Sequence, residues 1–271
     1  MVEKSREERI KEAVKVYYGA RAQMVTPSCC GPQACCGEVQ AGTQDVATPQ
    51  SESACCSGVN AESSLGCGNP LDFVGIQEGE TVLDLGSGLG LEVILAARMV
   101  GDGGTVIGLD MTPEMIDKAR QNAERAGVGH IAEFRLGEME NMPVEDKSVD
   151  RIVSNCVVNL SPDKDRVFGE AYRVLKPGGT LLISDLVSSG LPEEVRNDLS
   201  SWAQCLGGTV EEAEYLRLIE EAGFDEVAVV DKVDASALLA GTGCCCGVVE
   251  EKEQPRVDSI SVRAVKRTTE L

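Results

Sequence analysis

Histidine, aromatic residues and long apolar runs are all scarce in this sequence of 271 residues. His130 is the only histidine, which argues against a histidine-based nucleophile relay, a facial-triad site or a zinc site built from several histidines. Aromatic residues make up 3% of the chain and offer little stacking surface. No stretch approaches the roughly 18 apolar residues that a membrane span needs, and residues 1–15 are charged and lack the apolar segment of a secretory signal. We therefore expect a cytoplasmic protein with no membrane partner.

Positive charge is also in short supply. Lys and Arg number 25 against 45 Asp and Glu, so the formal net charge is −20. Most of such a surface repels a phosphate backbone, and nucleic acid is therefore not an expected partner. At roughly 150 residues per domain, the length indicates one enlarged domain or a domain with a small annex.

Cysteine, by contrast, is abundant, with 12 residues. In the cytoplasm thiols stay reduced and usually serve metals or catalysis. The C-x₂-C brackets of structural zinc sites are missing from the sequence. The clustered cysteines are Cys29, Cys30, Cys35, Cys36, Cys55, Cys56 and Cys244 to Cys246. Capture of a thiophilic ligand, disulfide cycling and an incidental solvated position are all interpretations that stay open for the clusters other than Cys29 and Cys30.

The chain divides into a helix, a polar loop and an alternating core. Residues 3–18 are predicted as a helix, with Ser5 and Glu8 in a capping box, and we expect this helix to pack on the main domain as a lid or brace. Residues 26–64 are rich in Gly, Pro, Ser, Gln and Cys and are predicted as a loop. Beyond Gly66, short apolar strands alternate with helical segments, which is typical of a parallel sheet covered on both faces.

The predicted strands are 81–85, 105–110, 131–135, 149–154 and 180–186, and the predicted helices are 89–100, 113–126, 164–175, 192–205 and 210–222. Two further strand-like runs, 226–231 and 257–265, are expected to close the sheet as an antiparallel pair.

The segment VLDLGSGLGLEV predicts a strand, a tight turn and the start of a helix. Gly86, Gly88 and Gly90 allow the backbone to approach a ligand where a side chain would collide. Asp110 ends the next strand, where a carboxylate can accept hydrogen bonds from a ribose diol. The spacing differs from the G-x-G-x-x-G of nicotinamide sites, and the loop alone is also consistent with an ordinary tight turn.

Four sequence blocks resemble, in order and spacing, those of the class I S-adenosylmethionine-dependent methyltransferases: DLGSGLG, GLDMTPEMIDKAR, LGEMENMP and RVLKPGGTLLISD. The resemblance covers roughly residues 70–230. It implies a Rossmann-like α/β fold with a seven-stranded sheet and helices on both faces, to which the N-terminal helix, the Cys-rich loop and a small C-terminal extension are added. It also implies cofactor contacts from Asp84, Gly86 and Gly88 at the methionine end, Asp110 and Met111 at the ribose and adenine, Glu138 and Met139 at the adenine edge, and Asn155 beneath.

Three cysteines stand alone: Cys67 in SLGCGNP, Cys156 in SNCVVNL and Cys205 in WAQCLGG. Cys156 directly follows the fourth predicted strand, and ligands of open α/β sheets bind outside the carboxyl ends of the strands, so we expect it at the mouth of the site. A lone cysteine is also often a small buried hydrophobe, and that interpretation stays open for each. Soft thiolates favour soft or borderline centres, of which trivalent arsenic is one.

The surroundings of these cysteines resemble the arsenite methyltransferase family, through LGCGNP, SNCVVNLSPDK, LPEEVR followed by SWAQCLGG, and SISVRAVK. The helix that runs into YYG before a Cys-containing loop is similar to that family's start. The resemblance implies that Cys67, Cys156 and Cys205 bind As(III) and act in catalysis, with a fourth thiol from the N-terminal loop, Cys30 or Cys29 in its place. It implies methyl transfer from S-adenosylmethionine to arsenite and methylarsenite in arsenic detoxification, with thioredoxin or a glutathione-like thiol as reductant and co-substrate.

This interpretation divides the chain into residues 1–65, with the helix and Cys-rich loop, residues 66–190, the cofactor-binding core, and residues 191–271, with closing strands and Cys205. It also explains the scarcity of histidine, because an arsenic lone pair held near a methyl group needs no general base. Methylarsenite has one ligand position taken by carbon, so Cys156 and Cys205 are expected to suffice for it. A monomer is favoured.

Two alternatives stay open. A methyltransferase for another small acceptor, such as a quinone or sterol precursor, leaves the three isolated cysteines unexplained. A thiol-based metalloid-binding protein without turnover can share the fold, because function resides in the site. Such a protein has no need of S-adenosylmethionine, so cofactor binding separates it from the enzyme.

Overall fold

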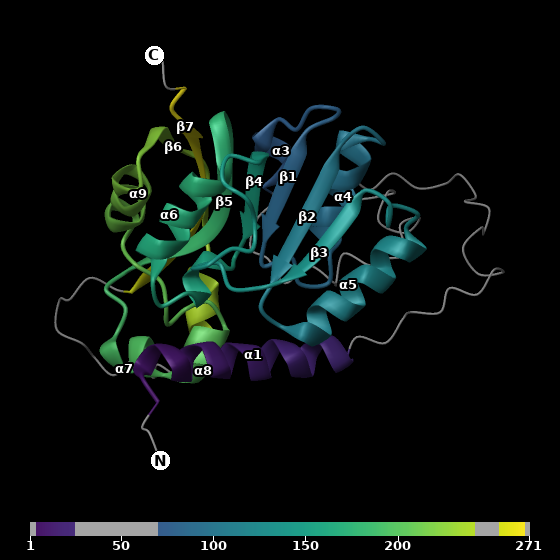
Figure 1. The fold of residues 1–271 in the computed structure, drawn as a ribbon. Coiled ribbons are helices and arrows are strands. Elements are labelled where there is room, and N and C mark those ends of the chain that lie inside the picture. Colours follow the sequence, from purple (N-terminus) through teal and green to yellow (C-terminus); the bar gives the residue numbers. More distant parts are fainter. Residues whose placement is uncertain (1–3, 25–69, 242–254, 269–271) are drawn as a thin grey trace, which may run out of the picture.

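The computed structural model describes residues 4–24, 70–241 and 255–268. Its centre is a seven-stranded sheet in the order β3-β2-β1-β4-β5-β7-β6 (Figure 1). The strands are β1 (Thr81–Leu85), β2 (Thr105–Asp110), β3 (Ala132–Leu136), β4 (Val149–Asn155), β5 (Leu175–Ser189), β6 (Phe224–Asp234) and β7 (Arg256–Lys266). The first five strands run parallel, and β7 is antiparallel to both of its neighbours. The sheet confirms the predicted α/β fold, including the closing antiparallel pair.

Helices cover both faces of this sheet. They are α3 (Leu71–Val74), α4 (Leu91–Val100), α5 (Pro113–Arg125), α6 (Lys164–Val174) and α9 (Glu212–Glu221). Successive residues of β1 point to opposite layers: Val82 packs with α3, α4 and α5, whereas Leu83 packs with α6 and α9. Because both faces are buried, the central strands are almost continuously apolar, which is the pattern that made them recognisable in the sequence.

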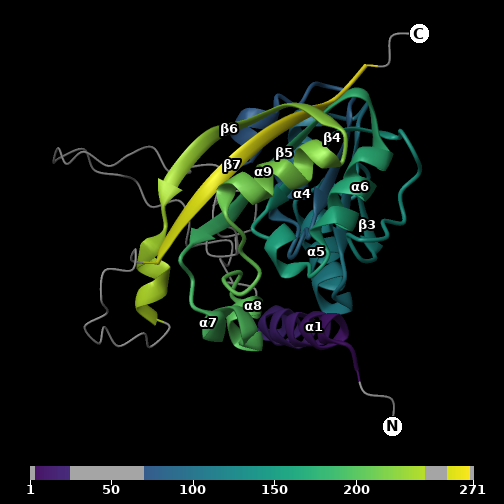
Figure 2. The same ribbon diagram turned by 90° about the vertical axis from the view of Figure 1, so that its left-hand side faces the viewer.

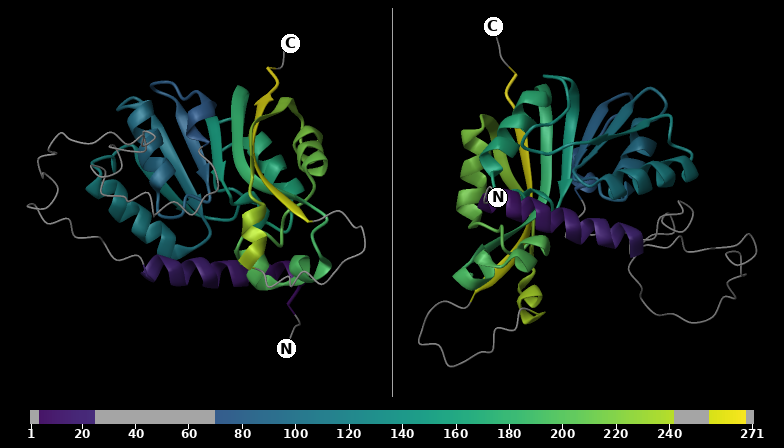
Figure 3. Two further views of the ribbon diagram at one scale, coloured as in Figure 1. Left: turned by 180° about the vertical axis from the view of Figure 1, so that it is seen from behind. Right: turned by 60° about the horizontal axis from the view of Figure 1, so that its bottom comes forward.

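The predicted N-terminal helix is α1 (Arg6–Met24), and it lies across one end of the sheet beside α7 (Glu193–Asn197) and α8 (Leu199–Ala203) (Figures 1 and 3). The capping box is confirmed: the Glu8 N–H donates to Ser5 Oγ over 3.2 Å, and the Ser5 N–H donates to Glu8 Oε2 over 2.8 Å. Ile10 and Val14 are buried in one apolar cluster with Trp202. The helix therefore packs on the main domain as expected.

Two elements differ from their predicted bounds. The single helix predicted over 192–205 is wrong, because the backbone breaks at Asp198, whose carboxylate caps α8 by accepting the Ser201 N–H over 2.8 Å. Strand β5 is much longer than the predicted 180–186, and it pairs with β7 from Thr180 to Ser189 (Figure 2). The short 3₁₀ helices η2 (Val158–Leu160) and η3 (Ser236–Gly241) complete the described elements. None of the described helices combines the length and hydrophobicity needed to cross a membrane.

Candidate functional site

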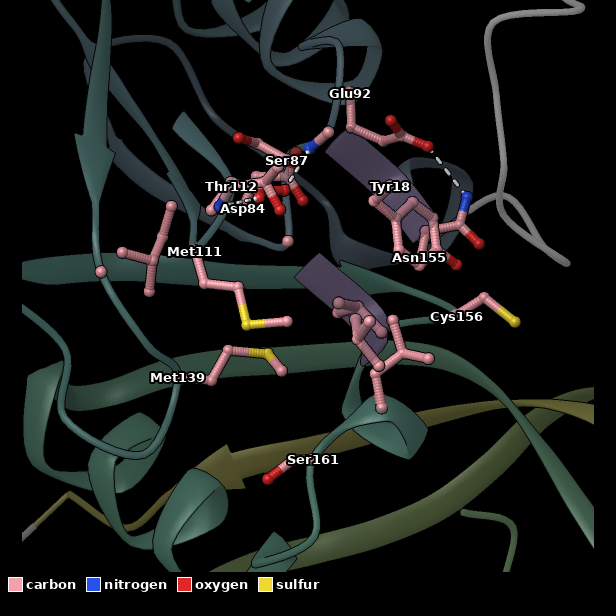
Figure 4. A pocket seen from close by; sticks show the side chains of 18 of the residues that line it. Tyr18, Asp84, Ser87, Glu92, Met111, Thr112, Met139, Asn155, Cys156 and Ser161 are labelled. Carbon is pink, nitrogen blue, oxygen red and sulfur yellow. Dashed lines mark hydrogen bonds between the residues drawn. The ribbon is translucent and has the colours of Figure 1, made fainter. Parts of the chain in front are cut away.

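A cavity with about 950 Å³ of empty space, partly open to solvent, lies at the carboxyl ends of β1, β2 and β4 (Figure 4). In open α/β sheets, ligands bind outside the carboxyl ends of the strands, so this is the expected place for a small molecule or cofactor. Helix α1 forms one wall through Lys11, Val14 and Tyr18. The residues expected at a cofactor that line this cavity are Asp84, Gly86, Gly88, Asp110, Met111, Met139 and Asn155.

The glycine turn between β1 and α4 brings two stretches of backbone together. Gly86 has φ +66°, in the left-handed region that disfavours a side chain. A Cβ at this position would lie 2.2 Å from Cγ2 of Val157, in the loop after β4. Glycine is therefore required here both by its backbone conformation and by the close approach of the loop that carries Cys156.

Three carboxylates gather beside this turn. Asp84 is 2% exposed, and its Oδ2 atom has no hydrogen-bond partner among the described residues. Asp110 accepts the Gly88 N–H over 3.0 Å and the Thr112 N–H over 2.8 Å, and Glu92 accepts the Asn155 amide over 2.8 Å. Burial raises the pKa of Asp84 well above its usual range, and the nearby charges of Glu92 and Asp110 add to the rise.

This acidic group suits a ligand that carries positive charge and hydrogen-bond donors. An unpartnered buried carboxylate oxygen costs free energy until a donor or cation reaches it. S-adenosylmethionine offers an ammonium, a sulfonium and a ribose diol, so the residues present fit that cofactor. The Oγ atom of Ser87 is also without a hydrogen-bond partner among the described residues and faces the same cavity (Figure 4).

The opposite wall comes from the segment after β3. Met139 and Glu140 line the cavity, whereas Glu138 does not, because its carboxylate accepts hydrogen bonds from Lys11 over 2.7 Å and Lys15 over 3.3 Å. The hydrogen bond from Lys11 lowers the pKa of Glu138. Glu140 is buried and accepts the Ser161 hydroxyl over 2.6 Å. A contact between Glu138 and the adenine edge stays a prediction.

Cys156 lines the cavity, and Cys205 contacts it from behind the lining, although 49 positions separate the two in the sequence. Both are buried, and the Cys205 thiol donates a hydrogen bond to the Cys156 carbonyl over 3.0 Å. The hydroxyl of Tyr18 lies 3.8 Å from Sγ of Cys205. Burial raises the pKa of Tyr18, and the neighbouring Cys205 raises it further, so this hydroxyl keeps its proton.

Both cysteines hold strained backbone. Their φ angles are +59° at Cys156 and +65° at Cys205, and these are two of only four non-glycine residues with positive φ in the part of the chain that the structure describes. A non-glycine residue in this region costs on the order of 1 kcal/mol and persists where its surroundings fix it, often at a functional site. Strain at the two thiols therefore favours a functional role over simple packing.

The other predicted thiols, Cys29, Cys30 and Cys67, lie outside the described residues, as do the clusters at 35–36, 55–56 and 244–246. Within the described ranges, no group of three or more His, Cys, Asp or Glu side chains is arranged to hold a metal ion. The roles of the thiols and cofactor contacts stay predictions.

Several cavity residues were not predicted from the sequence: Lys11, Tyr18, Ser87, Glu92, Glu140 and Ser161. Glu92 lies in the first turn of the helix after the glycine loop, and that position is a signal that could have identified it. Lys11 and Tyr18 reach the cavity only because α1 docks there, which no local pattern reveals.

Comparison with known proteins gives consistent results. The family described as "Methyltransferase domain" matches residues 76–223. An arsenite methyltransferase of Halobacterium salinarum is 47% identical over 181 residues, which is 66% of this chain and 46% of the relative. An arsenite methyltransferase of Aquipseudomonas alcaligenes is 42% identical over 174 residues, covering 61% of this chain and 49% of the relative. The chain thus spans about half the length of these curated relatives.

Among solved structures, an arsenic (III) S-adenosylmethionine methyltransferase from Chlamydomonas reinhardtii superposes with a TM-score of 0.64 and 35% identity. The match covers 78% of this chain and 70% of that one.

Proposed function

Because this chain belongs to the methyltransferase domain family, which matches it over residues 76–223, we propose that it transfers methyl groups from S-adenosylmethionine to trivalent arsenic held by cysteine thiolates. The observation that carries the proposal is a pair of strained, buried thiols in contact: Cys156, which lines the acidic cavity, and Cys205, which donates to its carbonyl. The similarity to arsenite methyltransferases supports the choice of acceptor.

Different residues of the cavity would contact different parts of the cofactor. When bound, S-adenosylmethionine supplies an electrophilic methyl group on a positively charged sulfur. Asp84 and Glu92 present negative charge to its cationic groups, and Asp110 is placed at the end of β2 for a diol. Met111 and Met139 contribute apolar wall, and α1 excludes water from one side.

The thiols hold the acceptor without a general base. Each sulfur that replaces an oxygen ligand of arsenite forms an As–S bond, and the displaced hydroxide leaves as water with the thiol's proton. Arsenic stays trivalent and keeps its lone pair, which is the nucleophile. Holding that lone pair in place supplies the rate gain of proximity, and no histidine is needed.

The fuller ligand set extends this proposal. In this proposal arsenite is bound by Cys156, Cys205, Cys67 and a fourth thiol, which is Cys30 or, in its place, Cys29. Methylarsenite is bound by Cys156 and Cys205 alone. A thioredoxin or glutathione-like thiol serves as reductant, and we expect a cytoplasmic monomer that acts in arsenic detoxification. The division into residues 1–65, 66–190 and 191–271 follows the same scheme.

The proposal is tested by incubating the protein with arsenite, S-adenosylmethionine and a thiol reductant, and by separating the arsenic species with element-specific detection. Methylated arsenic is expected from the wild type and from Cys55→Ser, a control outside the proposed ligand set, but not from Cys156→Ser. A Cys67→Ser variant should lose activity on arsenite more than on methylarsenite. Tight arsenite binding without a methylated product would instead indicate sequestration, and neither binding nor product would refute arsenic as the ligand.

A further inference from the structure

Lys164 is a buried cation that the proposed mechanism does not use. It is 8% exposed and is the first residue of α6. The dipole of a helix disfavours positive charge in its first turn, and burial of an ammonium without an ion pair is costly. A lysine at this position therefore requires an explanation beyond solubility or helix formation.

The polar contacts of Lys164 leave its positive charge largely uncompensated. Its Nζ atom donates to the Ser161 carbonyl over 3.2 Å, and it forms no salt bridge among the described residues. Nζ also lies over the ring of Trp202, 5.7 Å from the centroid. Trp202 is in α8, one turn before Cys205, and the Cys205 N–H donates to the Trp202 carbonyl over 3.0 Å. The ammonium thus contacts both the loop after Cys156 and the helix α8, which ends just before Cys205.

Two carboxylates whose charges act on this ammonium, Asp185 and Glu140, already have other donors. Asp185, in β5, accepts the Asn159 N–H over 3.0 Å and the Tyr215 hydroxyl over 3.1 Å. Glu140 pairs with Lys11 over 3.1 Å and accepts the Ser161 hydroxyl. Burial lowers the pKa of Lys164 to about 8, against the opposing charges of Asp185, Glu140 and Cys205. Of these three groups, Cys205 is the one whose charge changes when it binds a thiophilic ligand.

We propose that Lys164 is a positioning residue of the thiol site. Its side chain holds Trp202 of α8 in place, and its positive charge stabilises the sulfur of Cys205 as the thiol proton leaves. This inference rests on the proposed function and deepens it. In the ligation step, the Cys205 sulfur forms a bond to arsenic, an As–O bond breaks, and the oxygen leaves as water with the thiol proton. Lys164 keeps its own proton throughout. A nearby positive charge attracts the negative charge that develops on sulfur as the proton leaves, and thus favours such a step.

The single tryptophan of the sequence makes this step observable, because Trp202 emission reports on the contact itself. We would mix the full-length reduced protein with phenylarsine oxide, which offers two exchangeable oxygen positions, and follow Trp202 fluorescence by stopped flow. Lys164→Met is expected to slow capture at least tenfold, with a changed emission spectrum of the unliganded protein. Lys164→Arg should keep most of the rate, and Lys147→Met, at an exposed lysine before β4, should match the wild type.

Two further measurements separate positioning from a merely structural role. S-adenosylhomocysteine should bind Lys164→Met within twofold of the wild type. The free energy of unfolding of this variant should stay equal or rise, because an apolar residue of similar length replaces an unpaired buried charge. An unchanged capture rate, or parallel losses of stability and S-adenosylhomocysteine binding, would overturn the inference.

Failure of the proposed function gives a different result. If the wild type does not capture phenylarsine oxide, arsenic is not the ligand, and Lys164 is then judged by iodoacetamide labelling of Cys205, followed by mass spectrometry of its peptide. Slower labelling in Lys164→Met than in Lys147→Met upholds the charge effect on Cys205. Equal labelling rates overturn it.

Discussion

Replacing Gly86 with alanine tests how tightly the glycine turn and the cysteine loop are fitted together. The added Cβ would lie 2.2 Å from Cγ2 and 2.8 Å from Cβ of Val157, so one of the two segments must move. Gly88 provides a matched control, because its φ of +50° is also left-handed, whereas its added Cβ would meet only the Gly86 carbonyl oxygen, at 4.0 Å. Both substitutions thus strain the backbone, but only Gly86→Ala collides with a neighbouring side chain, that of Val157.

The expected magnitudes follow from these two effects. Left-handed backbone costs an alanine roughly 1–2 kcal/mol, and forcing a methyl group into packed surroundings costs roughly 1–3 kcal/mol more. We therefore expect Gly88→Ala to lower the free energy of unfolding by about 1–2 kcal/mol and Gly86→Ala by about 2–5 kcal/mol. Val157→Ala removes the two colliding methyl groups but leaves Cβ at 2.8 Å, so a double-mutant cycle should recover part of the collision cost of roughly 1–3 kcal/mol.

Urea unfolding, followed by the fluorescence of Trp202, measures these free energies. Calorimetry measures the affinity of the cavity for S-adenosylhomocysteine. Gly86→Ala should weaken binding, and adding Val157→Ala should restore part of it. Equal destabilisation by the two glycine substitutions, or additivity of Gly86→Ala with Val157→Ala, would refute the close approach on which the reasoning depends.

Two further predictions concern buried carboxylates. Asp84→Asn should weaken S-adenosylhomocysteine binding at least tenfold, as measured by calorimetry. The affinity of the wild type should fall as the pH drops through the raised pKa of Asp84, because the carboxylate loses its charge. The affinity of the variant should depend less on pH. Burial raises the pKa of Asp185 to about 6, above the 3.8 of the unfolded chain, so its contribution to stability is complete below pH 3.8 and is lost as the pH rises through about 6. Relative to Asp185→Asn, the wild type should lose up to about 3 kcal/mol of unfolding free energy over that range, and parallel pH profiles from urea unfolding would contradict the assignment.

The sequence patterns predicted the elements whose cause is local. Strand β1 and strand β2 were placed at their observed bounds because apolar runs ended at glycine and at Asp110. The start of β5 was missed because residues 176–179 interrupt the ladder, and the register shifts there between Val149 and Arg151 of β4. The strand resumes at Thr180 beside β4 and β7, and beyond Ser184 it continues to Ser189 through its pairing with β7, a partner that lies far along the chain.

The site divides in the same way. Cys156 could be placed at the cavity because it follows a strand, and the topology of parallel sheets fixes where strands end. The contact between Cys205 and Cys156 depends on the packing of α8, so only the family resemblance suggested it. No local pattern predicted the burial of Lys164, since a lysine at the first position of a helix is expected at the surface, whereas this one packs over Trp202.

The position of β7 inside the sheet has a consequence for synthesis. β7 lies between β5 and β6 although it follows both in the chain, so a nascent chain that has completed β6 at Asp234 still lacks the strand that joins them. Translation of the 32 residues from Asp234 to Lys266 takes about 2–6 s at roughly 5–20 residues per second. During that interval the edge of β5 offers unpaired backbone groups to other chains. Chains that lack β7 are thus exposed to pairing of the β5 edge with other chains, and slowing translation within residues 235–266 should lower the soluble yield.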